Sequence, residues 1–363
     1  MDLTLTNPTA AGFTYPHALL AALGDESALR YTPDPRGLLV ARASVAAAYG
    51  ARGIAVDPDS VLLTASTSEA YSFIFKLLCD PGDEVLVPVP SYPLFEHLAS
   101  LDGVTLKTYP LEYHGVWSMD VEQLVAETTE RTRAVIVVAP NNPTGSLLRR
   151  AQWEQLASFC AARDVAVIAD EVFLDYLLEP AEDGVRGVVD GRQGAGGPLL
   201  FSLGGLSKSI GLPQHKLGWM IVQGPEDKAT VALERLQWIG DTYLSVATPV
   251  QVAAPRLLEE GAAVRTQIRV RLGANLATLK ARLVDSPSCE VLRVEGGWSA
   301  VIRVPAIRSE EDLACSLIEE HGVLVHPGYF YDFSRSAHLV VSLLASPDVF
   351  EQGVDRLCRS VET

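Results

Sequence analysis

The chain has 363 residues, of which 48% are hydrophobic and 20% are charged, a composition typical of a folded protein with a large core. Its 29 basic and 45 acidic residues give a formal net charge of −16, which argues against nucleic acid or an anionic membrane surface as a partner. The five cysteines are widely spaced and form no Cys-x-x-Cys pair, so we expect neither a disulfide framework nor a bound metal.

The beginning of the chain carries no targeting pattern. It has no basic region followed by an apolar core, and no apolar run in the chain approaches the ~20 residues that span a bilayer, so we expect a cytoplasmic protein. Residues 2–25 are rich in turn formers, and Tyr31 precedes a helical pattern over 38–50, on which its ring would pack. The length exceeds what one core usually organises, so we expect a large domain and a smaller one.

A predicted helix over 70–78 begins in a hydroxyl-rich turn. Ser66 or Thr67 is suited to cap this helix, because a side-chain oxygen can accept from the free amides of the first turn. Those amides and the helix dipole also favour an anion, so Thr67 and Ser68 are equally suited to hold a phosphate. Further on, Tyr92 lies between two prolines, where its flat face could cover the core or, as we favour, stack on an aromatic ligand.

Strands and helices alternate through the middle of the chain. Strands are predicted over 104–109, 134–138 and 165–169, with helices over 121–127 and 149–163 between them. This alternation predicts a doubly wound α/β sheet with helices on its faces. Beyond it we expect the following elements: a surface loop within 179–197, strands over 198–203 and 217–222, helices over 225–243, 248–259 and 264–284, and a small domain with strands at 291–294, 300–304 and 338–343 and a helix at 310–321.

Three polar residues, Asn142, Asp170 and Lys208, each come shortly after a predicted strand. Because the carboxyl ends of parallel strands open into one crevice, we expect these side chains to converge. A lysine in a partly desolvated pocket has a destabilised ammonium, and its free amine can form a Schiff base with an aldehyde. Taken singly, Asn142 would form an Asx turn, Asp170 would cap a turn, and Lys208 would be a loop lysine. Taken together, the three predict pyridoxal phosphate.

The stretches around these residues are Asn141–Gly145, Ala169–Phe173 and Leu203–Ser209. They resemble the pyridoxal-phosphate-dependent fold-type I enzymes, specifically the class I/II aminotransferase superfamily. The resemblance runs from Tyr31 to about Leu357 and implies an α/β fold with a large domain, whose mixed and mostly parallel sheet is flanked by helices, and a small α+β domain. The implied division is an N-terminal arm over 1–30 that packs with the small domain, a large cofactor-binding domain over 31–255 and a small domain over 256–363.

The resemblance also implies a role for each motif residue. Lys208 would hold pyridoxal 5'-phosphate as a Schiff base and, once released, move the proton of the substrate Cα. Asp170 would keep the pyridine nitrogen protonated, Asn142 would donate to the phenolic oxygen, and Tyr92 would lie over the ring. Tyr31 would reach the cofactor phosphate of a partner subunit, which implies a homodimer. The remaining phosphate contacts would come from Thr67, Ser68, Ser207 and Lys216, with Ser209 as a further candidate.

Several positions depart from the pattern of the family. Phe173 stands where many members have a tyrosine that donates to the phenolic oxygen, Gly205 replaces a phosphate-binding serine, and Lys216 replaces an arginine. Val340 stands where these aminotransferases carry the arginine that binds the substrate carboxylate, and valine cannot bind a carboxylate. His326 could also point into the cleft, although a histidine at the end of a strand is more often structural. Other candidates for the missing charge are Arg335, His338, Arg303 and Arg36.

Three functions follow from these features. The first is an aminotransferase that acts on a small amino-acid-type substrate through the Lys208 Schiff base. The alternative is a lyase that eliminates a β-substituent, as in carbon–sulfur cleavage, or a decarboxylating or oxidatively deaminating enzyme of a natural-product pathway, which the losses at Phe173 and Val340 favour. A cofactor-binding effector domain of a transcription regulator is the third, for which an additional DNA-binding module would be expected.

Overall fold

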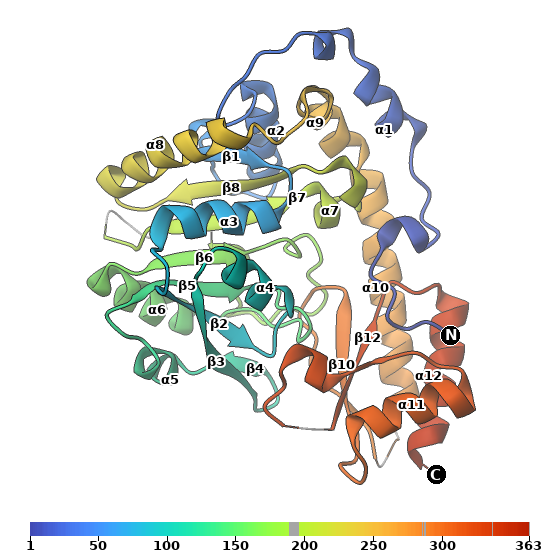
Figure 1. The fold of residues 1–363 in the computed structure, drawn as a ribbon. Coiled ribbons are helices and arrows are strands. Elements are labelled where there is room, and N and C mark those ends of the chain that lie inside the picture. Colours follow the sequence, from blue (N-terminus) through green and yellow to red (C-terminus); the bar gives the residue numbers. More distant parts are fainter. Residues whose placement is uncertain (189–195, 285, 287, 336, 363) are drawn as a thin grey trace.

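The computed structural model describes residues 1–188, 196–284, 286, 288–335 and 337–362, and Figure 1 shows how they are arranged. Part of the predicted surface loop, residues 189–195, lies outside the described residues. Two separate sheets form the framework, one of eight strands and one of four. The predicted α/β architecture is confirmed.

The large sheet has the strand order β1-β8-β7-β6-β5-β2-β3-β4. The five strands from β7 to β3 in this order run parallel, whereas β8 is antiparallel to β7, β1 to β8 and β4 to β3. The prediction of a mixed and mostly parallel sheet is therefore confirmed. The strands are β1 (Val61–Thr64), β2 (Glu84–Val89), β3 (Thr105–Tyr113), β4 (Trp117–Met119), β5 (Thr132–Val138), β6 (Ala166–Asp170), β7 (Leu200–Gly205) and β8 (Gly218–Gln223).

Both faces of this sheet are buried, which explains why its central strands are continuous apolar runs. In β6, Ala166 and Ile168 join the core beneath α3, α4 and α8, whereas Val167 and Ala169 join the core beneath α5 and α6. The covering helices are α3 (Thr67–Leu78), α4 (Leu94–Leu101), α5 (Val121–Ala126), α6 (Arg150–Arg163) and α8 (Glu226–Tyr243). Figure 1 shows these helices packed around the large sheet.

The small sheet is antiparallel, with the order β11-β12-β10-β9. Leu339 and Val341 of β12 face the core shared with the long helix α10, whereas Val340 between them faces the other way. The N-terminal segment adds to this region, because Leu3 donates to Leu324 O at 3.0 Å. The elements here are α10 (Ala262–Leu283), β9 (Glu290–Val291), β10 (Ser299–Arg303), α11 (Glu310–His321), β11 (His326–Pro327), η7 (Gly328–Tyr331), β12 (His338–Ser342) and α12 (Pro347–Glu362).

The structure differs from the prediction at the strand expected over 291–294. β9 ends at Val291, because the backbone amides of Glu295 and Gly296 bond to Gly145 O, at 3.2 and 3.0 Å, instead of continuing the small sheet. The helices α4 and α12 and the short strand β4 were not predicted.

Further helices of the structure are α1 (His17–Ala21), η3 (Glu26–Leu29), α2 (Leu39–Gly50), α7 (Leu206–Ser209) and α9 (Thr248–Glu260). Within the described part of the chain, no helix is both long enough and apolar enough to cross a bilayer.

Candidate active site

A pocket of about 450 Å³ lies where β5, β6 and β7 end, and residues of the small sheet close its other side. This position agrees with the general rule that ligands bind at the carboxyl ends of parallel strands. The pocket brings together most of the residues singled out in the sequence: Thr67, Ser68, Tyr92, Asn142, Asp170, Phe173, Ser207 and Lys208.

Lys208 lies on the short helix α7, directly after β7. Tyr176, which the sequence did not reveal, fixes this turn by donating from its hydroxyl to Lys208 O at 2.7 Å. The Lys208 ammonium lies 4.8 Å from the ring centre of Trp298 and 5.6 Å from that of Phe173. Burial lowers the pKa of Lys208, although the nearby Asp170 carboxylate opposes this shift. The environment therefore favours the uncharged amine, which is the nucleophilic form.

Asp170 ends β6 and is held by two donors. The hydroxyl of Tyr71, from α3, donates to Oδ2 at 2.9 Å, and the backbone amide of Val172 donates to Oδ1 at 3.2 Å. Burial raises the pKa of Asp170, whereas these hydrogen bonds and Lys208 lower it. The carboxyl group is thus fixed in orientation, and its pKa is raised overall because burial is the largest effect.

Asn142 follows β5 in a tight turn. Gly145 N donates to Asn141 O at 2.8 Å to close this turn. Gly145 has a φ of +70°, and a Cβ there would lie 2.5 Å from Gly296 O, so only glycine fits. Asn142 Oδ1 accepts from the Ser299 hydroxyl at 3.5 Å, and its amide nitrogen has no acceptor among the described residues. The amide nitrogen is therefore available to donate to a ligand.

The end of the pocket beside α3 is suited to an anion. Ser66 caps this helix by accepting from Glu69 N at 3.2 Å, which settles the choice of capping residue. Thr67 and Ser68 begin the helix and line the pocket together with Ser207, so hydroxyls, first-turn amides and the helix dipole all face one point.

Three of the predicted cofactor contacts lie elsewhere. Lys216 is exposed and Ser209 is buried, and neither of them lines the pocket. The backbone explains the position of Lys216, which is left-handed, with a φ of 51°, at the end of a 3-10 turn. Tyr31 is 70% exposed and lines a different surface pocket with Gly240 and Leu244. Within one chain, the structure does not bring these residues to Lys208.

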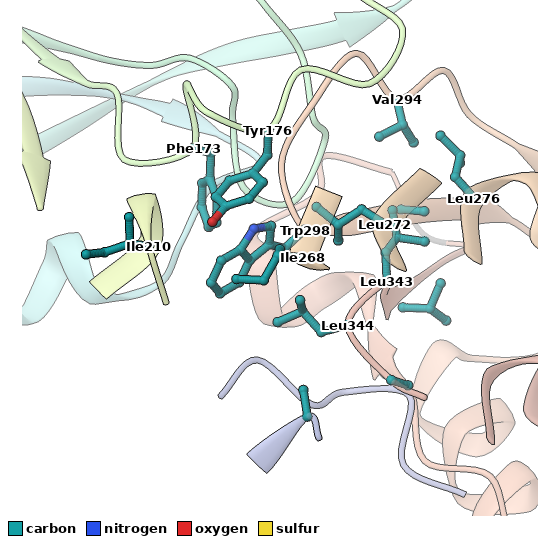
Figure 2. Packing of buried hydrophobic residues seen from close by; sticks show 14 of the residues in the cluster. Phe173, Tyr176, Ile210, Ile268, Leu272, Leu276, Val294, Trp298, Leu343 and Leu344 are labelled. Carbon is teal, nitrogen blue, oxygen red and sulfur yellow. The ribbon is translucent and has the colours of Figure 1, made fainter. Parts of the chain in front are cut away.

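The opposite end of the pocket contains residues that no sequence motif identified. Trp298 packs edge-to-face on Phe173 and Tyr176, with ring centres 5.4 and 5.3 Å apart. Figure 2 shows this aromatic cluster beside Ile268 and Leu344. The other residues at this end are Thr6, Ser299, His326 and Tyr331. Of these residues, only His326 was a candidate from the sequence, because the others lie in segments without a recognisable motif.

The arginines and the histidine considered in place of the missing arginine are not in the pocket. Arg303 pairs with Glu290 on the surface, Arg36 pairs with Asp59, and Arg335 is exposed. Within one chain, these three arginines therefore do not line the pocket. His338 is also outside, because it is buried against Phe333, with ring centres 4.7 Å apart. Of the candidates named from the sequence, only His326 lines the pocket.

The chemistry of the pocket fits pyridoxal phosphate. It offers an anion site at the start of α3, an amine with a lowered pKa at Lys208, a carboxylate at Asp170 and a free amide donor at Asn142. Close backbone approach supports the anion site, because a Cβ at Gly218 would lie 3.0 Å from the backbone of Ser66. Among the described residues, no group of acids, histidines and cysteines could hold a metal ion.

Comparison with known proteins supports the same interpretation. The family model for aminotransferase class I and II matches residues 2–360. The arginine–pyruvate transaminase of Pseudomonas aeruginosa is 29% identical over 89% of this chain and 80% of that protein. The alanine aminotransferase of Mycobacterium tuberculosis is 27% identical over 96% of this chain and 82% of that protein. The solved structure of an alanine aminotransferase from Pyrococcus furiosus has a TM-score of 0.88 at 24% identity and covers 100% of this chain and 92% of that one.

The family match spans nearly the whole chain, and the fold agrees with that of the solved aminotransferases. The comparisons support transamination and give no support to the lyase, decarboxylating, oxidative or effector alternatives. The chain therefore belongs to the class I and II aminotransferases, which depend on pyridoxal phosphate.

Proposed function

We propose that the protein transfers the amino group of an α-amino acid to a 2-oxo acid in the pocket around Lys208. The observation that carries this proposal is the meeting of Lys208, Asp170 and Asn142 at the ends of three neighbouring strands, opposite the anion site of α3. Two relatives support the substrate class, since their names are arginine–pyruvate transaminase and glutamate–pyruvate aminotransferase.

The residues divide into those that hold the cofactor and those that move the proton. Thr67, Ser68 and Ser207 would bind the phosphate, and Asn142 would donate to the phenolic oxygen. When bound, pyridoxal phosphate supplies an aldehyde that takes up the amino group and a ring that accepts the electron pair released at the substrate Cα. Asp170 holds a proton on the ring nitrogen, which strengthens that electron acceptor.

Lys208 acts as the general base that takes the proton from the substrate Cα and returns it. The rings of Trp298 and Phe173 lie 4.8 and 5.6 Å from its amine, and burial lowers the pKa of Lys208, which favours this role. Tyr92, which is 48% exposed, lies at the mouth of the pocket and would cover the ring. Phe173 has no hydroxyl, so the phenolic oxygen would rely on Asn142 alone in this part of the site.

We also propose a homodimer in which Tyr31 reaches the partner's phosphate site. Large apolar side chains support this, because Leu29 and Trp238 are 90% and 77% exposed near Tyr31, on η3 and α8. We keep the division into an arm over 1–30, a large domain over 31–255 and a small domain over 256–363. A cytoplasmic location is proposed because the five cysteines are widely spaced and form no Cys-x-x-Cys pair, a pattern that fits a reducing compartment.

The first experiment mixes pyridoxal-phosphate-loaded protein with a panel of amino acids and no keto acid. We expect stoichiometric conversion of the cofactor absorbance to that of the pyridoxamine form, reversed by pyruvate. Release of ammonia, thiol or carbon dioxide with continued turnover would contradict transamination.

For the dimer, we expect that mixing inactive Lys208→Ala chains with Tyr31→Ala chains restores activity, because each heterodimer has one intact site. Failure of the mixture to recover, or a fully active monomer in sedimentation, would disprove the role of Tyr31.

A further inference from the structure

The end of the pocket remote from α3 has a charge pattern that the motifs do not explain. Its walls are Thr6, Tyr92, Trp298, Ser299, His326 and Tyr331. Among the described residues that line the whole pocket, the only basic side chains are Lys208 and His326, and the only acid is Asp170. If Lys208 and Asp170 serve the cofactor, His326 is the remaining basic side chain among the described residues that line the pocket, and it can bring a positive charge to the substrate.

His326 is held in one orientation. It begins β11, and its Nδ1 lies 2.9 Å from the hydroxyl of Tyr331. Burial raises the pKa of Tyr331 to about 12, so this hydroxyl keeps its proton and can donate to a neutral Nδ1 or accept from a protonated one. In the imidazolium form, Nδ1 donates to Tyr331 and Nε2 also carries a proton, and Nε2 makes no hydrogen bond to any described residue although His326 lines the pocket. Nε2 is therefore a donor without an acceptor.

The neighbouring strand offers no competing charge. His326 is paired with Val340 in the antiparallel ladder of β11 and β12. Val340 is 1% exposed and packs with Trp117, Val301 and Tyr331. The position next to His326 is thus filled by apolar packing, and the imidazole is the polar group that remains at this edge of the small sheet.

We infer that His326 Nε2 binds the carboxylate of the amino acid and of the 2-oxo acid, and that Tyr331 is the residue that positions the imidazole. This inference rests on the proposed function. A carboxylate that leaves water for a partly buried pocket needs a charge-assisted hydrogen bond, which an imidazolium supplies. The substrate class is accordingly α-amino acids with a free carboxylate, in preference to their amides and esters or to simple amines.

Binding of the carboxylate is coupled to proton uptake. Burial lowers the pKa of His326, and the Asp2 carboxylate in the N-terminal segment opposes this shift. Tyr331 is the other titratable group in contact with the ring, while Lys208 and Asp170 lie in the same pocket. The free imidazole is neutral near pH 7, and an arriving carboxylate raises its pKa. Carboxylate affinity therefore falls by up to about tenfold per pH unit above the pKa of the free protein.

The kinetic test compares His326→Gln with the surface variant His114→Gln. With the amino acid that converts the cofactor fastest, we expect His326→Gln to raise KM by about ten- to hundredfold and to leave kcat within about threefold. The ratio of wild-type to His326→Gln kcat/KM should fall as the pH rises, because the substrate amine and the cofactor titrate in both proteins. Tyr331→Phe should raise KM less, with the same pH trend. An unchanged KM in both variants would overturn the inference.

A binding test does not depend on turnover. Propanoate and propanamide, which have the same shape, are titrated into the pyridoxal-phosphate-loaded protein and followed through cofactor absorbance and calorimetry. We expect the wild-type protein to prefer propanoate by about tenfold or more at pH 6.5 and to take up a proton, and we expect His326→Gln to lose both effects. Retention of the preference in His326→Gln would refute the inference. If propanoate binds through His326 but no amino acid converts the cofactor, the proposed function fails and the inference stands.

Discussion

The two ends of the pocket are assembled from different parts of the chain. At one end, Asn142, Asp170 and Lys208 follow three adjacent strands of the large sheet, so their convergence is a direct result of parallel strand order. At the other end, Trp298 directly before β10 and His326 in β11 meet the first group because the turn at Glu295 and Gly296 is bonded to Gly145, after β5. The residues proposed to hold the cofactor and move the proton thus follow the strands of the large sheet, and the residues proposed to contact the substrate lie on or beside the small sheet.

Buried contacts hold these two ends together. Arg149 and Glu295 form a bidentate pair, with Nη1–Oε1 at 2.8 Å and Nη2–Oε2 at 2.9 Å. Glu295 also accepts from Leu147 N at 3.1 Å and Ala181 N at 3.0 Å. Because Glu295 lies shortly before Trp298 in the chain, these bonds connect one end of the pocket, which contains Trp298 and His326 and is called the recognition end below, to the helices and loops of the large sheet. Substitutions at the ends of the pocket and in the connection between them test this comparison.

Loss of the lysine should have the largest effect. Lys208→Ala removes the general base, so we expect kcat to fall by about 10⁴-fold. Rates of pyruvate formation from alanine, or of the best substrate found, measure this loss. The control Lys228→Ala removes an exposed lysine that pairs with Asp164 and should leave kcat unchanged. Retention of a tenth of the wild-type rate in Lys208→Ala would contradict the assignment.

Breaking the connection should affect both ends. Glu295→Ala removes the bidentate partner of the Arg149 guanidinium, whose side chain is 12% exposed, and leaves it the exposed Asp183 carboxylate at 3.4 Å. We expect the free energy of unfolding to fall by about 3–5 kcal/mol, measured by urea denaturation. The double variant Arg149→Met with Glu295→Met should regain part of this loss, because the guanidinium is removed while the amides of Leu147 and Ala181 still lack their acceptor. A loss below about 1 kcal/mol in Glu295→Ala would show that the pair does not hold the sheets together.

Asp170, which lies with Asn142 and Lys208 at the chemical end of the pocket, should affect kcat more than substrate binding. Asp170→Asn keeps the size of the side chain and removes its charge, so we expect kcat to fall by about 10²- to 10³-fold with KM changed much less. Steady-state kinetics with saturating cofactor measures both constants. A rise in KM of about 10²- to 10³-fold with an unchanged kcat would instead assign Asp170 to substrate binding, and the two ends of the pocket would then not differ in role.

The smallest expected effect concerns the support of that acid. Tyr71→Phe removes a hydroxyl that stabilises the Asp170 carboxylate and thereby lowers its pKa. The pKa of Asp170 should therefore rise, and the acid limb of the pH profile of kcat should move to higher pH. At neutral pH, we expect the activation free energy to rise by about 1 kcal/mol, the energy of one hydrogen bond. Tyr243→Phe, on a half-exposed ring, is the control. An acid limb that does not move would show that Tyr71 only packs.

The sequence predicted the chemical end of the pocket well and the recognition end poorly. Asn142, Asp170 and Lys208 could be found because each follows a buried strand, and strand order alone brings them to one edge. The resemblance to the family placed Lys216 near the phosphate, whereas within one chain the backbone is left-handed there and the side chain is exposed. Spacing along an irregular loop does not fix the direction of a side chain, whereas spacing along a strand does.

By itself, the sequence determined the alternation of buried strands and amphipathic helices, the mixed parallel sheet and the cofactor class, because these depend on local patterns and on the rule that parallel strands end at one edge. Only the tertiary structure decided which residues face Lys208 from the small sheet. Tyr71, Trp298 and the pair of His326 and Tyr331 reach the pocket through contacts between segments far apart in the chain. Such contacts depend on how whole elements pack, and no local pattern records them.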